Sequence, residues 1–156
     1  MSGYQSLLAL HIVAGTAGLL LGPAVAWADA RASRRSSPLW TAYLGAVGAV
    51  CLTAVGLVLW HRTDLWWLIP VSTLTVALAA LGRSALDRPG AWDHAYVHGL
   101  GGSYIALITA TVVVSFAIDG PLHGPAQLIA WLGPTVLGAP LLELWRRHAA
   151  KRRVFR

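Results

Sequence analysis

The chain has 156 residues, of which 56% are hydrophobic and only 12% are charged. A soluble domain carries about a quarter charged residues, so this composition excludes a soluble globular domain. The formal net charge of +6 would suit a nucleic-acid-binding protein, but the basic residues lie beside apolar segments and form no nucleic-acid-binding motif. We therefore expect an integral membrane protein that binds no nucleic acid.

Five apolar segments approach the roughly 20 residues that a helix needs to cross a bilayer. In chain order they cover residues 4–27, 39–60, 65–82, 92–118 and 126–145, and a basic tail follows at 146–156. Because lipid offers no hydrogen bonds to the backbone, each segment is expected to be an α-helix. The sequence predicts an all-α fold in which residues 1–156 form a single transmembrane bundle of five helices.

The basic residues predict the orientation of the bundle. Of the twelve Lys and Arg residues, only Arg62 falls on the side opposite the 28–38 loop. The side of that loop receives the others, namely Arg31, Arg34, Arg35, Arg83, Arg88, Arg146, Arg147, Lys151, Arg152, Arg153 and Arg156. Since basic residues accumulate on the cytoplasmic side, the amino terminus is predicted outside and the carboxyl terminus in the cytoplasm, as five helices require.

Other residue types indicate the kind of membrane and its interfaces. The chain has no asparagine and a single lysine, which is typical of a GC-rich bacterial genome, so we expect a bacterial inner membrane. Anionic lipid head groups are the expected partners of Arg146, Arg147, Arg152 and Arg153 in the tail. Tryptophan prefers membrane interfaces, and the ends of the predicted helices hold Trp27, Trp40, Trp60, Trp66, Trp67, Trp92 and Trp145.

The six histidines divide into two layers in this topology. His11, His61 and His123 belong to the outer half, and His94, His98 and His148 belong to the inner half. Only His11 and His98 lie within apolar segments, where an ionisable side chain is a functional candidate by default. Their depths differ by roughly 10 Å at the helical rise, so we do not expect them to bind the same metal.

Each layer offers a candidate metal site. His94 and His98 are four residues apart and share one face of a helix, although H-x-x-x-H alone is a weak motif. Asp87, Asp93, Tyr96 or a loop residue would have to complete an inner site. An outer site would pair His11 with His61. The alternative is structural: the buried imidazoles hydrogen-bond across helices, and the others are interfacial or loop residues.

The leading functional hypothesis is a membrane redox or electron-transfer protein. It would hold haem b through the intramembrane histidines, His11 in the outer layer or His98 in the inner layer, or a transition-metal ion through His94, His98 and His61. A second hypothesis is a cofactor-free subunit, small-solute carrier or lipid-interacting bundle. A membrane enzyme that acts on a quinone or a lipid comes third, and no nucleophile or phosphate-loop motif supports other enzyme classes.

Other polar and small residues have structural interpretations. Glu143 is expected to form helical ion pairs with Arg146 and Arg147. The glycines of GLGG at 99–102 are expected to allow close helix packing. Small residues also recur every four positions in three segments, and such stripes serve either the bundle itself or a homodimer.

Three stretches carry a resemblance, namely HIVAGTAGLLLGPAVAW (11–27), HGLGGSYIALITATVVVSF (98–116) and WLGPTVLGAPLL (131–142). They resemble a family of small bacterial membrane proteins that is catalogued as a domain of unknown function. The resemblance implies a multi-helix bundle whose polar positions include His11 and His98. Members often carry a further histidine before the second helix, where this chain reads PLWTAYLG with Trp40.

Overall fold

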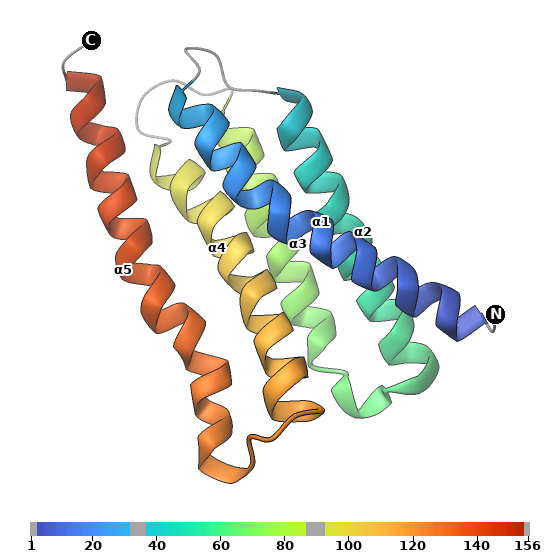
Figure 1. Cartoon of the computed structure of the whole chain (residues 1–156). Helices are drawn as coiled ribbons and strands as arrows, with labels where there is room; N and C mark the ends of the chain where they lie inside the picture. Colours follow the sequence, from blue (N-terminus) through green and yellow to red (C-terminus); the bar gives the residue numbers. More distant parts are fainter. Residues whose placement is uncertain (1–2, 32–36, 87–92, 155–156) are drawn as a thin grey trace.

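The computed structural model describes residues 3–31, 37–86 and 93–154, which form helices and contain no strand (Figure 1). The five long helices are α1 (Gly3–Arg31), α2 (Ser37–His61), α3 (Leu68–Ala85), α4 (Asp93–Val112) and α5 (Gln127–Val154). Three short turns are η1 (Thr63–Leu65), the π-helical η2 (Val113–Ile118) and η3 (Gly124–Ala126). All five long helices are long and apolar enough to cross a membrane. The prediction of an all-α, multi-pass membrane protein is therefore confirmed.

Several helix boundaries differ from the predicted ones, and the first and third helices end at Arg31 and Ala85 rather than at residues 27 and 82. The third helix begins at Leu68 rather than residue 65, because Thr63–Leu65 form a separate turn. Pro70 then lies in the first turn of α3, where its missing N–H removes no helical hydrogen bond. The fifth helix continues through most of the basic tail to Val154. Ala, Arg and Lys favour the helix, so it does not need lipid to persist there.

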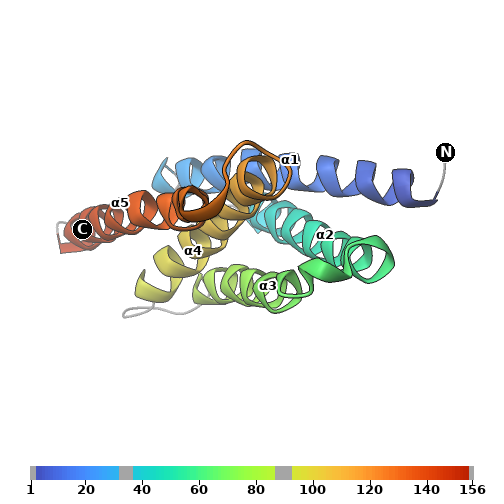
Figure 2. The same cartoon turned by 90° about the horizontal axis from the view of Figure 1, so that it is seen from below.

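Helix α4 lies at the centre of the bundle (Figure 2). It packs against α1, α3 and α5, and α2 packs against α1 and α3. Helix α5 contacts mainly α4 and η2, so it is the most peripheral helix of the five. The odd-numbered helices run in one direction, from the end that we call the N end to the end that we call the C end. Arg62 lies at the N end, and Arg146 and Arg147 lie at the C end.

A close backbone contact joins α3 to α4. A Cβ atom built on Gly99 would lie 2.4 Å from the backbone nitrogen of Gly82, so no side chain fits between the two helices here. The fully buried side chains of Trp40, Tyr43 and Leu100 form the core beside this contact. The packing role predicted for the 99–102 glycines is confirmed at Gly99.

The outward faces of the helices are apolar. Leu20, Leu52 and Leu137 are each at least 70% exposed, and many other large apolar side chains are exposed with them. Patches of this extent do not face water in a monomer, but they suit a lipid environment. Trp27, Trp60 and Trp66 are also exposed near helix ends, as interfacial residues would be. Among the other predicted interfacial tryptophans that the structure describes, Trp67 and Trp145 are half-buried and Trp40 is completely buried.

Candidate functional site

A cavity of about 390 Å³ lies between α1, α2, α3 and α4 in the half of the bundle nearer the N end. Its inner wall consists of the buried side chains of Val50, Cys51, Ser72, Thr75 and Leu107. Its rim includes exposed residues from three helices and the π-helix, namely Ile12, Thr16, Val71, Thr111, Val114 and Ser115. Because these rim residues belong to membrane-spanning helices, the cavity opens sideways toward lipid.

The imidazole of His11 lines this cavity from α1. Its Nδ1 atom lies 3.1 Å from the carbonyl oxygen of Val50 and 3.0 Å from Oγ1 of Thr53, both on α2. The Thr53 hydroxyl donates to its own helix, with distances of 2.7 Å to the Ala49 carbonyl and 3.0 Å to the Val50 carbonyl. Its oxygen therefore accepts from His11, and the proton of the neutral ring is assigned to Nδ1.

This arrangement leaves the Nε2 atom of His11 as a hydrogen-bond acceptor. No described residue forms a hydrogen bond with that atom. A histidine whose Nδ1–H is held by a backbone carbonyl is fixed in ring orientation, and its Nε2 lone pair is available to a metal or a hydroxyl group. His11 is thus oriented by α2 and keeps its binding atom unused.

Three of the five hydroxyl groups that line the cavity are also acceptors. Thr16, Thr75 and Thr111 each donate to the carbonyl oxygen four residues earlier in their own helix, at 2.8–2.9 Å. Each donation uses the only proton of the hydroxyl and leaves lone pairs free. Cys51, Ser72 and Ser115 line the cavity as well. His11 and the three threonines therefore offer acceptors to a molecule that donates a hydrogen bond.

The π-helix η2 forms part of the rim. The backbone N–H of Asp119 donates to the Val114 carbonyl, five residues earlier, at 3.0 Å. The side-chain amide of Gln127 donates to the Ala117 carbonyl at 2.9 Å, which ties η2 to α5. Single π-helical turns occur frequently at functional sites, and this one places Val114 and Ser115 at the opening.

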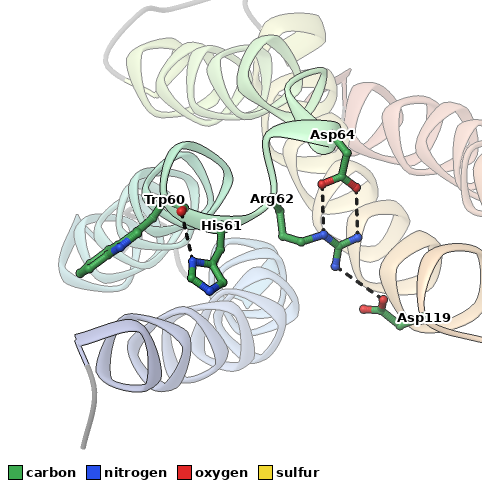
Figure 3. A network of polar contacts seen from close by, with 5 residues as sticks. All are labelled: Trp60, His61, Arg62, Asp64 and Asp119. Atoms are coloured by element: carbon green, nitrogen blue, oxygen red, sulfur yellow. Dashed lines mark hydrogen bonds and ion pairs between the residues drawn. The ribbon is translucent and has the colours of Figure 1, made fainter.

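His61 does not join His11. Its ring packs on Tyr4, with 4.7 Å between ring centroids, and its Nδ1 lies 3.1 Å from the Trp60 carbonyl (Figure 3). Tyr4 precedes His11 by seven residues, which is roughly 10 Å along a helix. The predicted outer pair of His11 and His61 is therefore not assembled. Helix tilt brings the end of α2 beside the first turn of α1.

His94 and His98 do come together at the start of α4. Their ring centroids are 4.5 Å apart, and Glu143 and Arg146 of α5 are close enough to act electrostatically on His98. Tyr96 does not complete a site, since its hydroxyl donates to Asp29 at 2.6 Å. The reason is geometric: residues two positions apart on a helix face different directions.

No third metal ligand accompanies this pair in the described part of the chain. Within residues 3–31, 37–86 and 93–154, no three His, Cys, Asp or Glu side chains form a group that could hold a metal ion. Asp87 lies outside the described residues, and so do the side chains of Asp93 and His148. A metal at His94 and His98 remains a prediction.

His11 and His98 occupy different levels. The cavity that contains His11 reaches α4 at Ala106 and beyond, and Ala106 is eight residues from His98. Eight residues correspond to roughly 12 Å of helix, so the two imidazoles lie in separate layers. They are not placed to ligate opposite faces of a single haem.

Asp29 is the polar residue that sequence reasoning missed. Its Oδ2 atom accepts hydrogen bonds from Trp40 Nε1 at 3.0 Å and from the Tyr96 hydroxyl at 2.6 Å. The rings of Trp40 and Tyr96 pack edge to face, with centroids 5.9 Å apart. Asp29 thus links α1, α2 and α4 near the C end. The only sequence signal was an acidic residue just beyond the predicted end of an apolar segment.

The predicted ion pairs of Glu143 are confirmed. Arg146 makes two hydrogen bonds to the carboxylate at 2.7 Å, and Arg147 makes one at 2.7 Å. A carboxylate shared by two guanidinium groups leaves this cluster with a net positive charge. The side chains of Arg152 and Arg153 lie outside the described residues, so their predicted lipid contacts are not addressed by the structure.

An exposed ion cluster connects two loops at the N end (Figure 3). Arg62 pairs with Asp64 at 3.2 Å and with Asp119 at 3.7 Å. The hydrogen bonds from Arg62 hold the pKa of the Asp64 carboxyl below its usual range. Because the cluster is exposed, its contribution to stability is small, and its role is to hold the 62–64 turn near the 119–123 loop.

Comparisons of the chain with protein-family models, curated proteins and solved structures give no match.

Proposed function

We propose that this multi-pass membrane protein binds a quinol-type molecule, an apolar ring that carries hydroxyl groups, in the cavity beside His11. The observation that carries the proposal is the Nε2 atom of His11, an acceptor to which no described residue donates, in a cavity that opens toward lipid. We further propose that the membrane is a bacterial inner membrane, with the N end outside, because eleven of the twelve basic residues fall on the other side.

The chemistry of the lining supports a reduced ring rather than an oxidised one. A quinol hydroxyl donates a hydrogen bond, which matches the acceptors of His11 and the threonines. A quinone has only carbonyl acceptors, so it would face the His11 lone pair without a proton between them. We therefore expect the cavity to prefer the quinol to the corresponding quinone.

The size and position of the cavity agree with this class of ligand. Its volume of about 390 Å³ falls in the range of small-molecule sites, which are mostly apolar with a few polar groups. A quinol dissolves in the bilayer, so it would enter through the lipid-facing rim without crossing water. The resemblance to the bacterial membrane family, which also points to His11, remains part of the proposal.

The expected haem b or metal ion finds less support in this cavity. His11 is the only histidine among its lining residues, and none of those residues is a lysine or an arginine. A haem would bring charged propionate groups, which need a cationic partner when buried. We therefore assign the proposed redox role to a bound quinol, and haem or metal binding stays an alternative for the experiment to distinguish.

The test uses purified protein in lipid nanodiscs, titrated with a short-chain menaquinol and, separately, with its menaquinone. The wild type should bind the quinol several times more tightly. His11→Phe removes the acceptor and should weaken quinol binding about fivefold, which corresponds to one net hydrogen bond, while menaquinone binding changes little. The matched control, His123→Phe, alters an exposed loop histidine and should change neither affinity.

Equal affinity for both forms, or an unchanged preference in His11→Phe, would reject the proposal. Absorption spectra before and after reduction, together with metal analysis, are recorded on the same sample. A Soret band that shifts on reduction would establish haem instead, and stoichiometric metal would redirect attention to His94 and His98. Protein without colour, metal or quinol binding would favour a cofactor-free subunit or carrier.

A further inference from the structure

A second cavity, of about 650 Å³, lies between α1, α4 and α5 and shares no lining residue with the cavity beside His11. Its walls are apolar side chains and glycines, apart from the ring hydroxyl of Tyr104 and the indole of Trp145. Residues from α5 form one full side, namely Gly133, Pro134, Leu137, Gly138, Leu141, Leu142 and Trp145. We call this cavity the α5 groove.

Small residues create the α5 groove. Gly101 and Gly138 bring α4 and α5 close, because a Cβ on either glycine would overlap Leu142 or Ile105 of the other helix. In the second turn of α5, a Cβ on Gly133 would meet nothing within 4 Å, so the groove is open there. Helix α1 closes the opposite side with Gly22 and two neighbours.

The length of the groove matches one leaflet. From Gly133 to Trp145 it follows α5 for twelve residues, or roughly 18 Å at the helical rise. The hydrocarbon core of a bilayer is about 30 Å thick, so one leaflet contributes about 15 Å. An occupant would thus belong to the leaflet at the C end, with its polar part near Trp145.

The charge at that end is positive. Arg146 and Arg147 directly follow Trp145 and share the single carboxylate of Glu143. Three more basic residues, Lys151, Arg152 and Arg153, follow within α5. No charged side chain lines the groove itself. A molecule with long apolar chains and an anionic head group would match both the apolar groove and the positive charge at its end.

We infer that the α5 groove binds one anionic phospholipid from the leaflet at the C end. Its acyl chain lies along α5 between Gly133 and Trp145, and its phosphate faces the arginines beyond Trp145. The groove shares no lining residue with the cavity beside His11, so the inference is independent of the proposed quinol binding.

The test counts lipids that remain bound to the full-length protein by native mass spectrometry. The protein is released from nanodiscs that contain phosphatidylglycerol and phosphatidylcholine in equal parts. The wild type should retain one phospholipid and favour phosphatidylglycerol. Gly133→Leu fills the open part of the groove and should abolish retention. Gly45→Leu is the matched control, because a Cβ on Gly45 of α2 also meets nothing within 4 Å.

Charge variants test the head group separately. Arg147→Gln should keep the lipid but lower the preference for phosphatidylglycerol about fivefold, the effect of one basic residue near an anionic surface. Glu143→Gln should raise that preference, since it frees both arginines. Proportional retention of the two lipids by the wild type, or equal retention by Gly133→Leu and Gly45→Leu, would overturn the inference. If Gly133→Leu does not fold, Leu137→Trp blocks the groove from an exposed position and carries the same expectation.

Discussion

Asp29 shows how a single carboxylate can organise the C end of the bundle. It accepts hydrogen bonds from an indole on α2 and a phenol on α4, and both donors belong to buried side chains. Hydrogen bonds to a charged acceptor are roughly twice as strong as neutral ones. If the acceptor is removed, the donors of Trp40 and Tyr96 are left without it in the protein interior, which is the more severe effect.

We therefore predict that Asp29→Ala destabilises the protein by about 2–4 kcal/mol, the combined effect on two buried donors. Its melting temperature in detergent should fall clearly below that of the wild type. Asp119→Ala is the control, because that carboxylate is exposed and makes only a 3.7 Å ion pair. If both variants melted together, Asp29 would not have the linking role described above.

His11 and Asp29 differ in how far the sequence alone identifies them. His11 was identifiable because an imidazole in an apolar segment is rare, and no other residue is needed to notice it. Its partners Val50 and Thr53 could not be identified from the sequence, because the rotation of α1 against α2 decides which carbonyl faces the ring. Asp29 lay just outside a predicted segment and looked like a loop residue, although α1 continues past it to Arg31.

At the scale of the elements, glycine determines where α3 and α4 cross. In lipid no hydrophobic effect drives helices together, so close backbone packing has to supply the attraction. The contact of Gly82 with Gly99 allows this, and the buried ring of Trp40 lies against the same crossing. The sequence indicated small residues at this place. It did not indicate the helix that packs against them, because the spacing of glycines within one helix does not identify the opposing helix.

We predict that Gly99→Ala separates α3 from α4. The added methyl group would lie 2.4–2.7 Å from backbone atoms of α3, which cannot move aside as a side chain can. Overpacking of this kind costs about 1–3 kcal/mol, so the melting temperature in detergent should drop. Gly45→Ala adds the same methyl group where nothing lies within 4 Å and should melt like the wild type. A Gly99→Ala protein as stable as Gly45→Ala would mean that the crossing is looser than described.

The short elements follow from constraints that periodicity does not reveal. All five spans were recognisable because an apolar run of sufficient length has few other folded forms. The π-helical turn at Val113–Ile118 could not be recognised from the sequence, because it depends on a change of hydrogen-bond register and on the amide of Gln127 from the next helix. Of the four alternatives for completing a site with His94 and His98, Tyr96 is directed elsewhere, because residues two positions apart on a helix face different directions and its hydroxyl donates to Asp29.

At the scale of the whole molecule, the two cavities lie in opposite halves of the bundle. The cavity beside His11 opens in the half near the N end, and the α5 groove ends beside the arginines of the C end. A quinol from one leaflet and an anionic lipid from the other would then bind to opposite halves of one protein. Which leaflet is which depends on the orientation of the chain, and only the charge distribution bears on it.

The orientation gives the last prediction. The proposal that the N end lies outside rests on the basic residues. Within the described helices and turns, Arg62 lies at the N end, and the C end has Arg31, Arg83, Arg146, Arg147, Lys151, Arg152 and Arg153. The single native thiol, Cys51, is buried and is first replaced by serine. Single cysteines are then introduced by His123→Cys at the N end and by Arg147→Cys at the C end, both at exposed positions. A membrane-impermeant maleimide should label His123→Cys in intact bacterial cells and leave Arg147→Cys unlabelled until the membrane is opened. The reverse pattern would turn the molecule over and move the proposed quinol site to the cytoplasmic leaflet.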